Sequence, residues 1–412
     1  MNPPPHPHRH TTPTAPNRRQ LLQAGLLATL ATAAAHPADA QTTQPAASPA
    51  TAQPPLREKF FGCIAACHIG SAMGAAVEGW PYERIQREYD TLDRLLSYQH
   101  YGNGWQREPG TTEDGVERQK LIIAAILDKQ DRVSAEDVRR AWLKYMNPKA
   151  AGLVSEPFEG ALLAMARSPM PASDIGKYCD YSGLISMARS CHPIGLINAG
   201  DINAAIHDVH DVGELYNTAN SRGIRWAECT VVAIAAATRP KATVDSVIAA
   251  ILDNCDKADP DYQKPVGVRA EIERALKRTE ACADFRDLRK AFDSLYSGSG
   301  IPYAQSYANE VVSKAVCVFR MVRGNTWPAI IAAVNMGRDT DCLASVAGGI
   351  SGALSGPASI PQAVIQQVDR ATSLNPHTCS RRTLRETSDA LYQAYKHRLK
   401  SLRDFAAEMD AA

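Results

Sequence analysis

Residues 62–76 read GCIAACHIGSAMGAA, and residues 348–356 read GGISGALSG. Both stretches have the apolar character of a buried helix, yet small residues, above all glycine, fill most of their positions. Glycine destabilises a helix interior by about 1 kcal/mol relative to alanine, so its density here requires a compensating gain from close backbone packing. We therefore predict two central helices that pack tightly against each other.

Helical periodicity extends outward from these two stretches over most of the chain after residue 55. Leu343, Val346, Ala347, Ile350 and Leu354 repeat at helical spacing, and similar patterns recur between breaks that carry proline and glycine. No segment shows sustained strand alternation, and no fixed-period repeat indicates a solenoid. Residues 56–412 are therefore predicted to form one compact all-α domain.

The segment before this domain has a different composition. Arg18 and Arg19 precede a short apolar stretch, which ends in the small residues of a signal-peptidase site at residues 38–40. This order is typical of a twin-arginine signal; a disordered basic tail beside a weak amphipathic helix is the alternative. We predict a Tat-type signal peptide at residues 1–40 and a flexible linker at residues 41–55. The Tat export machinery would then be a partner, and the mature protein periplasmic or secreted.

Composition excludes several classes of protein. A formal net charge of +1 and 45% hydrophobic residues describe an ordinary globular chain. This near-neutral net charge gives no sign of the basic surface that nucleic-acid binding needs, so no nucleic-acid partner is expected. No apolar run reaches the roughly 18 residues of a membrane span, so no permanent membrane anchor is expected.

Acidic residues gather beside the two small-residue stretches. Glu78 follows the first, Glu113 and Asp114 begin a helix, and Asp339 and Asp341 lead into the second stretch. Acidic side chains at a helix start often only cap the free backbone N–H groups. Capping needs one oxygen, however, and several carboxylates are present. Such hard oxygen ligands suit Mg²⁺ or Mn²⁺, and two ions can share a carboxylate. Spacing alone leaves both interpretations open.

The order of these motifs resembles the ADP-ribosylglycohydrolase family, whose usual strings run approximately GDALG…E, TDDT and GGDTDT. The corresponding residues here are 70–74 with Glu78, 112–115, and 337–342. Residues 186–195 are also similar to the family's central stretch. The set is in family order and spans most of the mature chain, so the protein looks like a divergent, exported, bacterial-type member.

The resemblance implies an orthogonal α-helical bundle that holds two divalent cations, Mg²⁺ or Mn²⁺, in a cleft. The reaction implied is hydrolysis of the glycosidic bond at the ribose of an ADP-ribosyl adduct, with Glu78 or Glu113 handling the proton of the attacking water. Arg189, Gly337 and Thr340 are expected to contact substrate, Arg189 at the pyrophosphate. A surface or structural arginine is the equal alternative for Arg189. The implied metal ligands are Thr112, Glu113, Asp114, Asp339 and Asp341.

Four positions depart from the family strings. Ser71 and Glu113 each replace an aspartate, and Gly115 and Cys342 each replace a threonine. A thiol is a poor ligand for hard Mg²⁺, so we expect a weak or water-completed second cation, or a softer ion such as Mn²⁺.

Three functions follow as hypotheses. The leading one is a metal-dependent hydrolase that cleaves an N- or O-glycosidic bond of an ADP-ribosyl or related ribosyl conjugate, its substrate being a small molecule or an ADP-ribosylated partner. A non-catalytic ADP-ribose-binding or structural relative on the same fold is the second. A hydrolase of a different extracytoplasmic glycoside is the third.

Overall fold

The computed structural model describes residues 53–100, 102–179, 183–255, 267–293, 295–296 and 306–411. The predicted signal peptide, and the predicted linker up to residue 52, lie outside the described residues. The chain divides into residues 1–51 and residues 52–412, and every described element belongs to the second unit.

The described part of the chain is built almost wholly of helices, which confirms the predicted all-α fold. The first half contains α1 (Leu56–Gly74), η1 (Ala75–Val77), α2 (Tyr82–Tyr89), α3 (Asp114–Lys129), α4 (Ala135–Tyr145), α5 (Glu159–Ala166), α6 (Ala172–Ile175), η2 (Gly176–Tyr178), α7 (Ser186–Ser190), α8 (His192–Ile197) and α9 (Ile202–Gly213). The second half contains α10 (Arg222–Ala237), α11 (Val244–Asn254), α12 (Val268–Arg278), α13 (Phe285–Asp293), α14 (Ala308–Met321), α15 (Thr326–Val334), α16 (Thr340–Ser355), α17 (Gln362–Leu374) and α18 (Leu384–Asp410).

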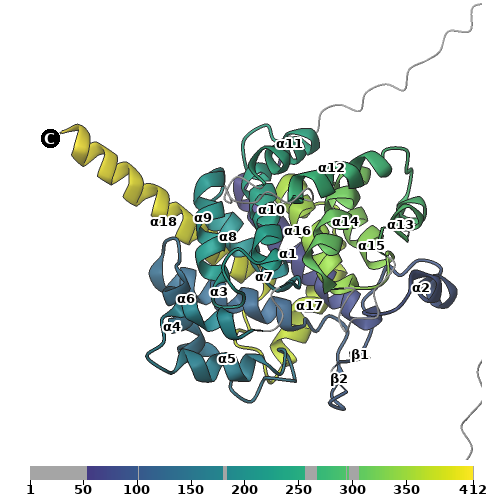
Figure 1. Cartoon of the computed structure of the whole chain (residues 1–412), viewed down its shortest axis with the longest axis horizontal. Helices are drawn as coiled ribbons and strands as arrows, with labels where there is room; N and C mark the ends of the chain where they lie inside the picture. Colours follow the sequence, from purple (N-terminus) through teal and green to yellow (C-terminus); the bar gives the residue numbers. More distant parts are fainter. Residues whose placement is uncertain are drawn as a thin grey trace, which may run out of the picture. The chain divides into compact units, whose positions relative to one another are not determined.

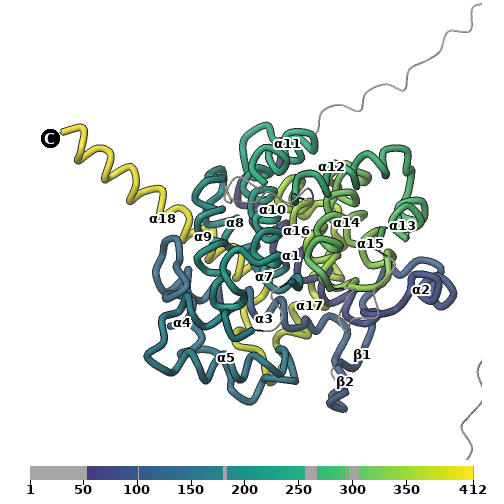
Figure 2. Tube along the Cα trace, viewed as in Figure 1, coloured from purple at the N-terminus to yellow at the C-terminus, as the bar shows by residue number. Residues whose placement is uncertain are grey.

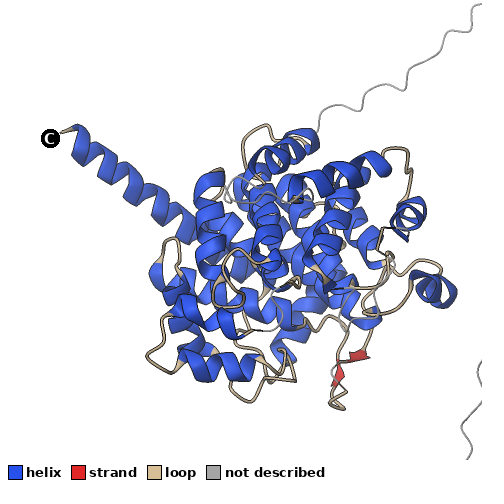
Figure 3. Ribbon diagram, in the orientation of Figure 1, coloured by secondary structure: helices blue, strands red, loops and turns tan. Residues whose placement is uncertain are grey.

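A short antiparallel ribbon interrupts the helices between α2 and α3. Its strands are β1 (Tyr98–Gln99) and β2 (Gln106–Arg107), and Tyr98 pairs with Arg107. The buried Tyr98 hydroxyl donates a hydrogen bond to the Thr111 carbonyl over 2.9 Å. The ribbon, which Figure 3 draws in red at one edge, thus supports the loop that leads into α3.

The two glycine-rich stretches form α1 and α16, which lie at the centre of the bundle (Figures 1 and 2). The helices are antiparallel, because Gly62 faces Gly352 at one end and Gly74 faces Asp341 at the other. A Cβ atom on Gly62 would lie 2.5 Å from the Gly352 carbonyl oxygen, and one on Gly70 would lie 2.4 Å from the Ala344 carbonyl oxygen. The predicted tight pair of central helices is therefore confirmed, and its backbones touch because these positions lack side chains.

Helix α1 also has a bearing on membrane association. Within the described residues, the stretch Leu56–Val77 is long and apolar enough for a membrane span, and 94% of its apolar window is buried inside the fold. It is not a run of strictly apolar residues, because Lys59 and His68 interrupt it. The Lys59 ammonium donates to the Ala237 carbonyl oxygen over 2.7 Å, inside the domain. These contacts are those of the core helix of a globular domain.

The other helices enclose this pair. Helix α10 is buried nearly all round and contacts α7, α8, α9, α14 and α16. Helix α18 packs against α1 through Phe60, whose ring centroid lies 5.4 Å from that of Tyr392 and 5.6 Å from that of Tyr395. The last turns of α18, residues 401–410, are exposed and project from the bundle (Figure 1).

Candidate active site

The antiparallel packing of α1 and α16 brings the C-terminal end of one helix to the N-terminal end of the other. The Thr340 hydroxyl donates to the Gly74 carbonyl oxygen over 2.8 Å. Beyond it, the backbone N–H of Gly79 donates to the Arg338 carbonyl, and that of Arg338 donates to the Trp80 carbonyl, each over 2.7 Å. These bonds hold the loop after η1, which contains Glu78, beside the acidic start of α16.

Two residues predicted to contact substrate, Thr340 and Gly337, lie at this junction. Thr340 is fully buried and uses its hydroxyl on Gly74. Gly337 has a φ of +72°, and a Cβ atom there would lie 2.6 Å from the backbone nitrogen of Tyr82. Both residues therefore position the loop before Asp339, and their contacts are with the protein.

The start of α3 contributes the second acidic group. Glu113 is the N-cap of this helix, and its Oε2 accepts a hydrogen bond from the Gly115 backbone N–H over 2.7 Å. Its Oε1 accepts from the Ser71 hydroxyl of α1, also over 2.7 Å. Ser71 and Glu113, which both depart from the family strings, are thus joined by a hydrogen bond in which Ser71 is the donor. Thr112, in the loop before the cap, is buried.

Arg189 of α7 lies inside the acidic cluster. Its Nη1 is 3.2 Å from Glu113 Oε2 and 3.5 Å from Asp341 Oδ2, while its Nη2 pairs with Asp114 Oδ2. The same Nη1 lies 3.0 Å from Cys342 Sγ. The sequence predicted that Arg189 faces a substrate pyrophosphate; the structure places its guanidinium among carboxylates of α3 and α16, where it is almost fully buried.

Burial and charge divide the acidic groups into two sets. Burial raises the pKa of Asp114, but the positive charges of Arg189 and Arg118 outweigh it, so that the pKa lies below its ordinary value. Burial raises the pKa of Asp339 and of Asp341, and repulsion from Glu78 adds to both effects. Asp114 is therefore held as a carboxylate by protein charges, whereas for Asp339 and Asp341 the charge of Arg189 does not outweigh burial and repulsion.

The residues at the start of α16 fit a bound cation. Asp339, Asp341 and Cys342 each offer a ligand atom, and these atoms lie within 4.8 Å of one another. Both carboxylate oxygens of Asp339 and the Oδ1 of Asp341 are buried and accept no hydrogen bond from the described residues. Buried charged oxygens without partners are costly, and a divalent cation satisfies them.

The residues at the start of α3 do not fit a second cation in the same way. The carboxylate oxygens of Glu113 accept from Ser71 and Gly115. Asp114 Oδ2 is paired with Arg189 and lies 3.2 Å from Arg118 Nη2. The resemblance implies two cations. The structure offers open carboxylate oxygens for one cation at the start of α16, whereas the carboxylate oxygens at the start of α3 are already bonded within the protein.

A cavity of about 120 Å³ opens beside this cluster. Its walls include Glu78, His100, Asp114, Glu156 and Arg189. His100 Nε2 lies 2.7 Å from Glu78 Oε2. Burial, with repulsion from Asp114, raises the pKa of Glu156 from 4.5 to about 7. The cavity therefore combines an oriented carboxylate with a carboxyl group that titrates near neutrality.

Sequence reasoning missed His100 and Glu156. His100 follows β1, and Glu156 lies in a loop before α5. Neither belongs to a motif with diagnostic spacing, and both reach the cavity only through the fold. A lone glutamate before proline carries no signal that distinguishes it from a surface residue.

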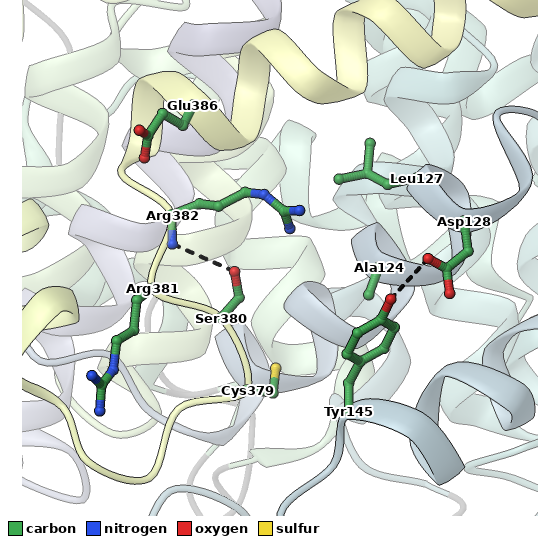
Figure 4. Close-up of a pocket in the computed structure, with 9 residues that line it drawn as sticks. All are labelled: Ala124, Leu127, Asp128, Tyr145, Cys379, Ser380, Arg381, Arg382 and Glu386. Carbon is green, nitrogen blue, oxygen red and sulfur yellow. Dashed lines mark hydrogen bonds between the residues drawn. The ribbon is translucent and has the colours of Figure 1, made fainter.

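A wider cavity of about 590 Å³ lies elsewhere, against the C-terminal half of α3 (Figure 4). Figure 4 shows Tyr145 and Asp128 on one side, joined by a 2.8 Å hydrogen bond, and Arg382 on the other. Glu386 caps the start of α18 by accepting from the Thr383 backbone N–H. The predicted site residues are not among those that line it, so the smaller cavity is the candidate active site.

The sequence pattern of the family described as ADP-ribosylglycohydrolase matches residues 52–400. A solved structure described as an ADP-ribosylglycohydrolase-related protein complex is similar to this chain, with a TM-score of 0.58 and 15% identity, over 83% of this chain and 98% of that one. At this identity the likeness concerns the fold alone. No curated protein sequence matches the chain.

Proposed function

Because the chain belongs to the ADP-ribosylglycohydrolase family, we propose that it is a cation-assisted hydrolase of an N- or O-glycosidic bond in an ADP-ribosyl or related ribosyl conjugate. The observation that carries the proposal is the set of buried oxygens without hydrogen bonds on Asp339 and Asp341, beside a cavity lined by Glu78 and Glu156. Open carboxylates next to titratable ones are what such a reaction needs.

Asp339 and Asp341 would hold the cation, Mg²⁺ or Mn²⁺. When bound, it would supply a Lewis acid for the ribose hydroxyls and the attacking water. Cys342 is the weakest of the available ligands, because burial raises its pKa well above the ordinary value and keeps it a neutral thiol. The two aspartates therefore form the core of the proposed cation site.

Glu78 and Glu156 have complementary roles in this proposal. Glu78 faces His100 over 2.7 Å, which orients its carboxylate as a base for the attacking water. Glu156, with a pKa of about 7, is protonated in part at neutral pH and is suited to donate a proton to the leaving group. The pairing of one base and one acid is the usual requirement for glycoside hydrolysis.

Glu113, predicted as a catalytic alternative to Glu78, has a different place in this proposal. Its two oxygens accept from Ser71 and Gly115 and face Arg189. A carboxylate bonded on both oxygens is poorly placed to take a proton from water. We assign Glu113 to the support of the site.

A non-catalytic relative remains the second candidate function. The observation that favours it is the ion pairing of Arg189 with Glu113 and Asp114, which places a fixed positive charge beside two of the acidic residues. A hydrolase of another extracytoplasmic glycoside is the third. It draws support from the proposed Tat export, which rests on Arg18, Arg19 and the cleavage-site residues, and which would place the protein in the periplasm or outside the cell.

The test is release of free ADP-ribose. The protein is incubated with Mg²⁺ or Mn²⁺ and ADP-ribosyl-arginine or an ADP-ribosyl-serine peptide, and the product is followed by chromatography. We expect release that is lost in Asp339→Ala and after chelation, and retained in Asp128→Ala, which alters an aspartate of the other cavity. A different result would favour the binding function: folded, cation-loaded protein binds ADP-ribose but cleaves neither ADP-ribosyl substrate.

A further inference from the structure

We propose that the Arg189 guanidinium takes the place of one of the two divalent cations implied by the family resemblance, so that this chain binds a single cation. That cation is the one assigned above to Asp339 and Asp341, and to this extent the inference rests on the proposed function. Arg189 is then a built-in cation, a positioning residue that holds the start of α3 against the start of α16.

Three buried carboxylates converge on the Arg189 side chain. Glu113 and Asp114 from α3, and Asp341 from α16, all face the Arg189 guanidinium, with the two Nη1 distances at 3.2 and 3.5 Å. All four side chains are at most 7% exposed. Carboxylates from two separate elements that meet in a buried place require a positive charge between them. Here the protein supplies that charge itself.

Arg189 also occupies the space beside Gly115. A Cβ atom on Gly115 would lie 2.7 Å from Arg189 Cδ and 2.9 Å from Arg189 Nε. Any side chain at position 115, including the threonine of the family string, would collide with the arginine as it lies here. Glycine at this position therefore leaves room for the arginine in the position that it takes here.

Cys342, the second position that lacks the family's threonine, also contacts the guanidinium. Its sulfur lies 3.0 Å from Arg189 Nη1 and is a weak acceptor. A thiol is a poor ligand for a hard cation but can lie against an arginine at little cost. Gly115 and Cys342, the two positions at which this chain lacks the family's threonine, thus lie against the same arginine. Replacement of one cation by the Arg189 guanidinium accounts for both differences.

Further contacts keep Arg189 in place. Gln119 of α3 donates its side-chain N–H to the Arg189 carbonyl oxygen over 2.7 Å. Asp114 has a second partner in Arg118, whose Nη2 is 3.2 Å away and whose Nε donates to Glu159. The charge of Asp114 is therefore compensated within the protein, and both oxygens of Glu113 accept hydrogen bonds, in contrast to the open oxygens of Asp339.

The experiment counts bound Mn²⁺ on the full chain by equilibrium dialysis and follows its spectrum by electron paramagnetic resonance. We expect one ion per chain in the wild type, none in Asp339→Asn, and a second ion in Arg189→Ala, where Glu113 and Asp114 become available. Arg132→Ala is the matched control. Arg132 Nε lies 2.9 Å from Oδ2 of the buried Asp208. The variant therefore removes the arginine partner of a buried aspartate elsewhere in the fold, but it frees a single carboxylate and should add no ion.

The outcomes separate this inference from the proposed function. Two ions in the wild type, or no gain in folded Arg189→Ala, overturn the inference and leave the proposed function standing. Absence of any bound Mn²⁺ in the wild type overturns both. Arg189→Ala leaves buried carboxylates unpaired and can fail to fold, so Asp114→Asn is a second variant. The inference expects its Mn²⁺ affinity to equal that of the wild type, whereas a cation bound by Asp114 would be lost.

Discussion

Single residues of the cavity owe their chemistry to neighbours that are distant in sequence. Glu156 illustrates this, because its raised pKa arises from burial and from the negative charge of Asp114. Glu78 is oriented by His100, and Glu113 is bonded by Ser71. The motifs predicted Glu113, Asp114, Asp339 and Asp341 as site residues, since acidic residues at helix starts can be recognised locally. They could not predict Glu156 or His100, because no local pattern marks either.

Glu156 leads to a prediction about pH. Its pKa in the folded state, about 7, lies above the ordinary 4.5, so the folded state binds this proton more tightly than the unfolded state. The free energy of unfolding therefore falls as the pH rises from about 4.5 to about 7. We expect Glu156→Gln to be more stable than the wild type at pH 8, by up to roughly 3 kcal/mol, and similar to it at pH 4.

Urea unfolding at the two pH values measures this difference. Glu136→Gln is a suitable control, because the Glu136 side chain is 46% exposed and lies outside the cavity. An equal effect of Glu156→Gln at both pH values would show that the Glu156 carboxyl is not perturbed as described. The same variant should lose ADP-ribose release if Glu156 is the proton donor.

At the scale of elements, the contact between α1 and α16 positions the site. Gly62, Gly70 and Gly74 follow one face of α1, and their missing side chains admit the backbone of α16. Glycine density in an apolar helix predicted this close contact. The antiparallel register, which sets Gly74 against Asp341, depends on how the intervening helices return the chain, and periodicity says nothing about that.

Gly70→Ala tests the contact. A Cβ atom at this position would lie 2.4 Å from the Ala344 carbonyl oxygen, with no flexible side chain to move aside. We expect a loss of about 1–3 kcal/mol of unfolding free energy or more, as for other overpacked cores, together with weaker Mn²⁺ binding. Gly160→Ala is the matched control, because its Cβ atom would lie 3.5 Å from the Ala151 Cβ atom in ordinary contact. That variant should be as stable as the wild type or slightly more so, because alanine favours the helix. Equal stability of the two variants would show that the helices have room to separate.

At the scale of the whole molecule, the bundle buries an acidic centre and leaves part of its charge to be compensated from outside. Asp339 and Asp341 come from the central helix α16, so a cation bound to them ties the core together. A ligand that binds only the folded state stabilises it by mass action. Stability of the domain should therefore respond to divalent cations.

Thermal unfolding with and without Mn²⁺ measures this response. At a free Mn²⁺ concentration of about 100 times Kd, we expect a gain of roughly 2.7 kcal/mol in unfolding free energy, reversed by a chelator. Asp339→Asn should abolish the gain, whereas Asp128→Asn should retain it because Asp128 lies at the other cavity. The same gain in both variants would assign the stabilisation to weak binding elsewhere on the surface.

The sequence by itself determined the helical class, the family and the pair of close central helices, because periodicity, glycine content and motif order are properties of neighbouring residues. It also identified the carboxylates at the starts of α3 and α16. Only the tertiary structure decided which positive charge meets which carboxylate. Arg189 lies 75 positions from Asp114 along the chain and 153 from Cys342, and it reaches both because α3, α7 and α16 converge and Gly115 leaves room. Charges in a buried site interact through space, so their pairing follows from the packing of helices and not from spacing along the chain.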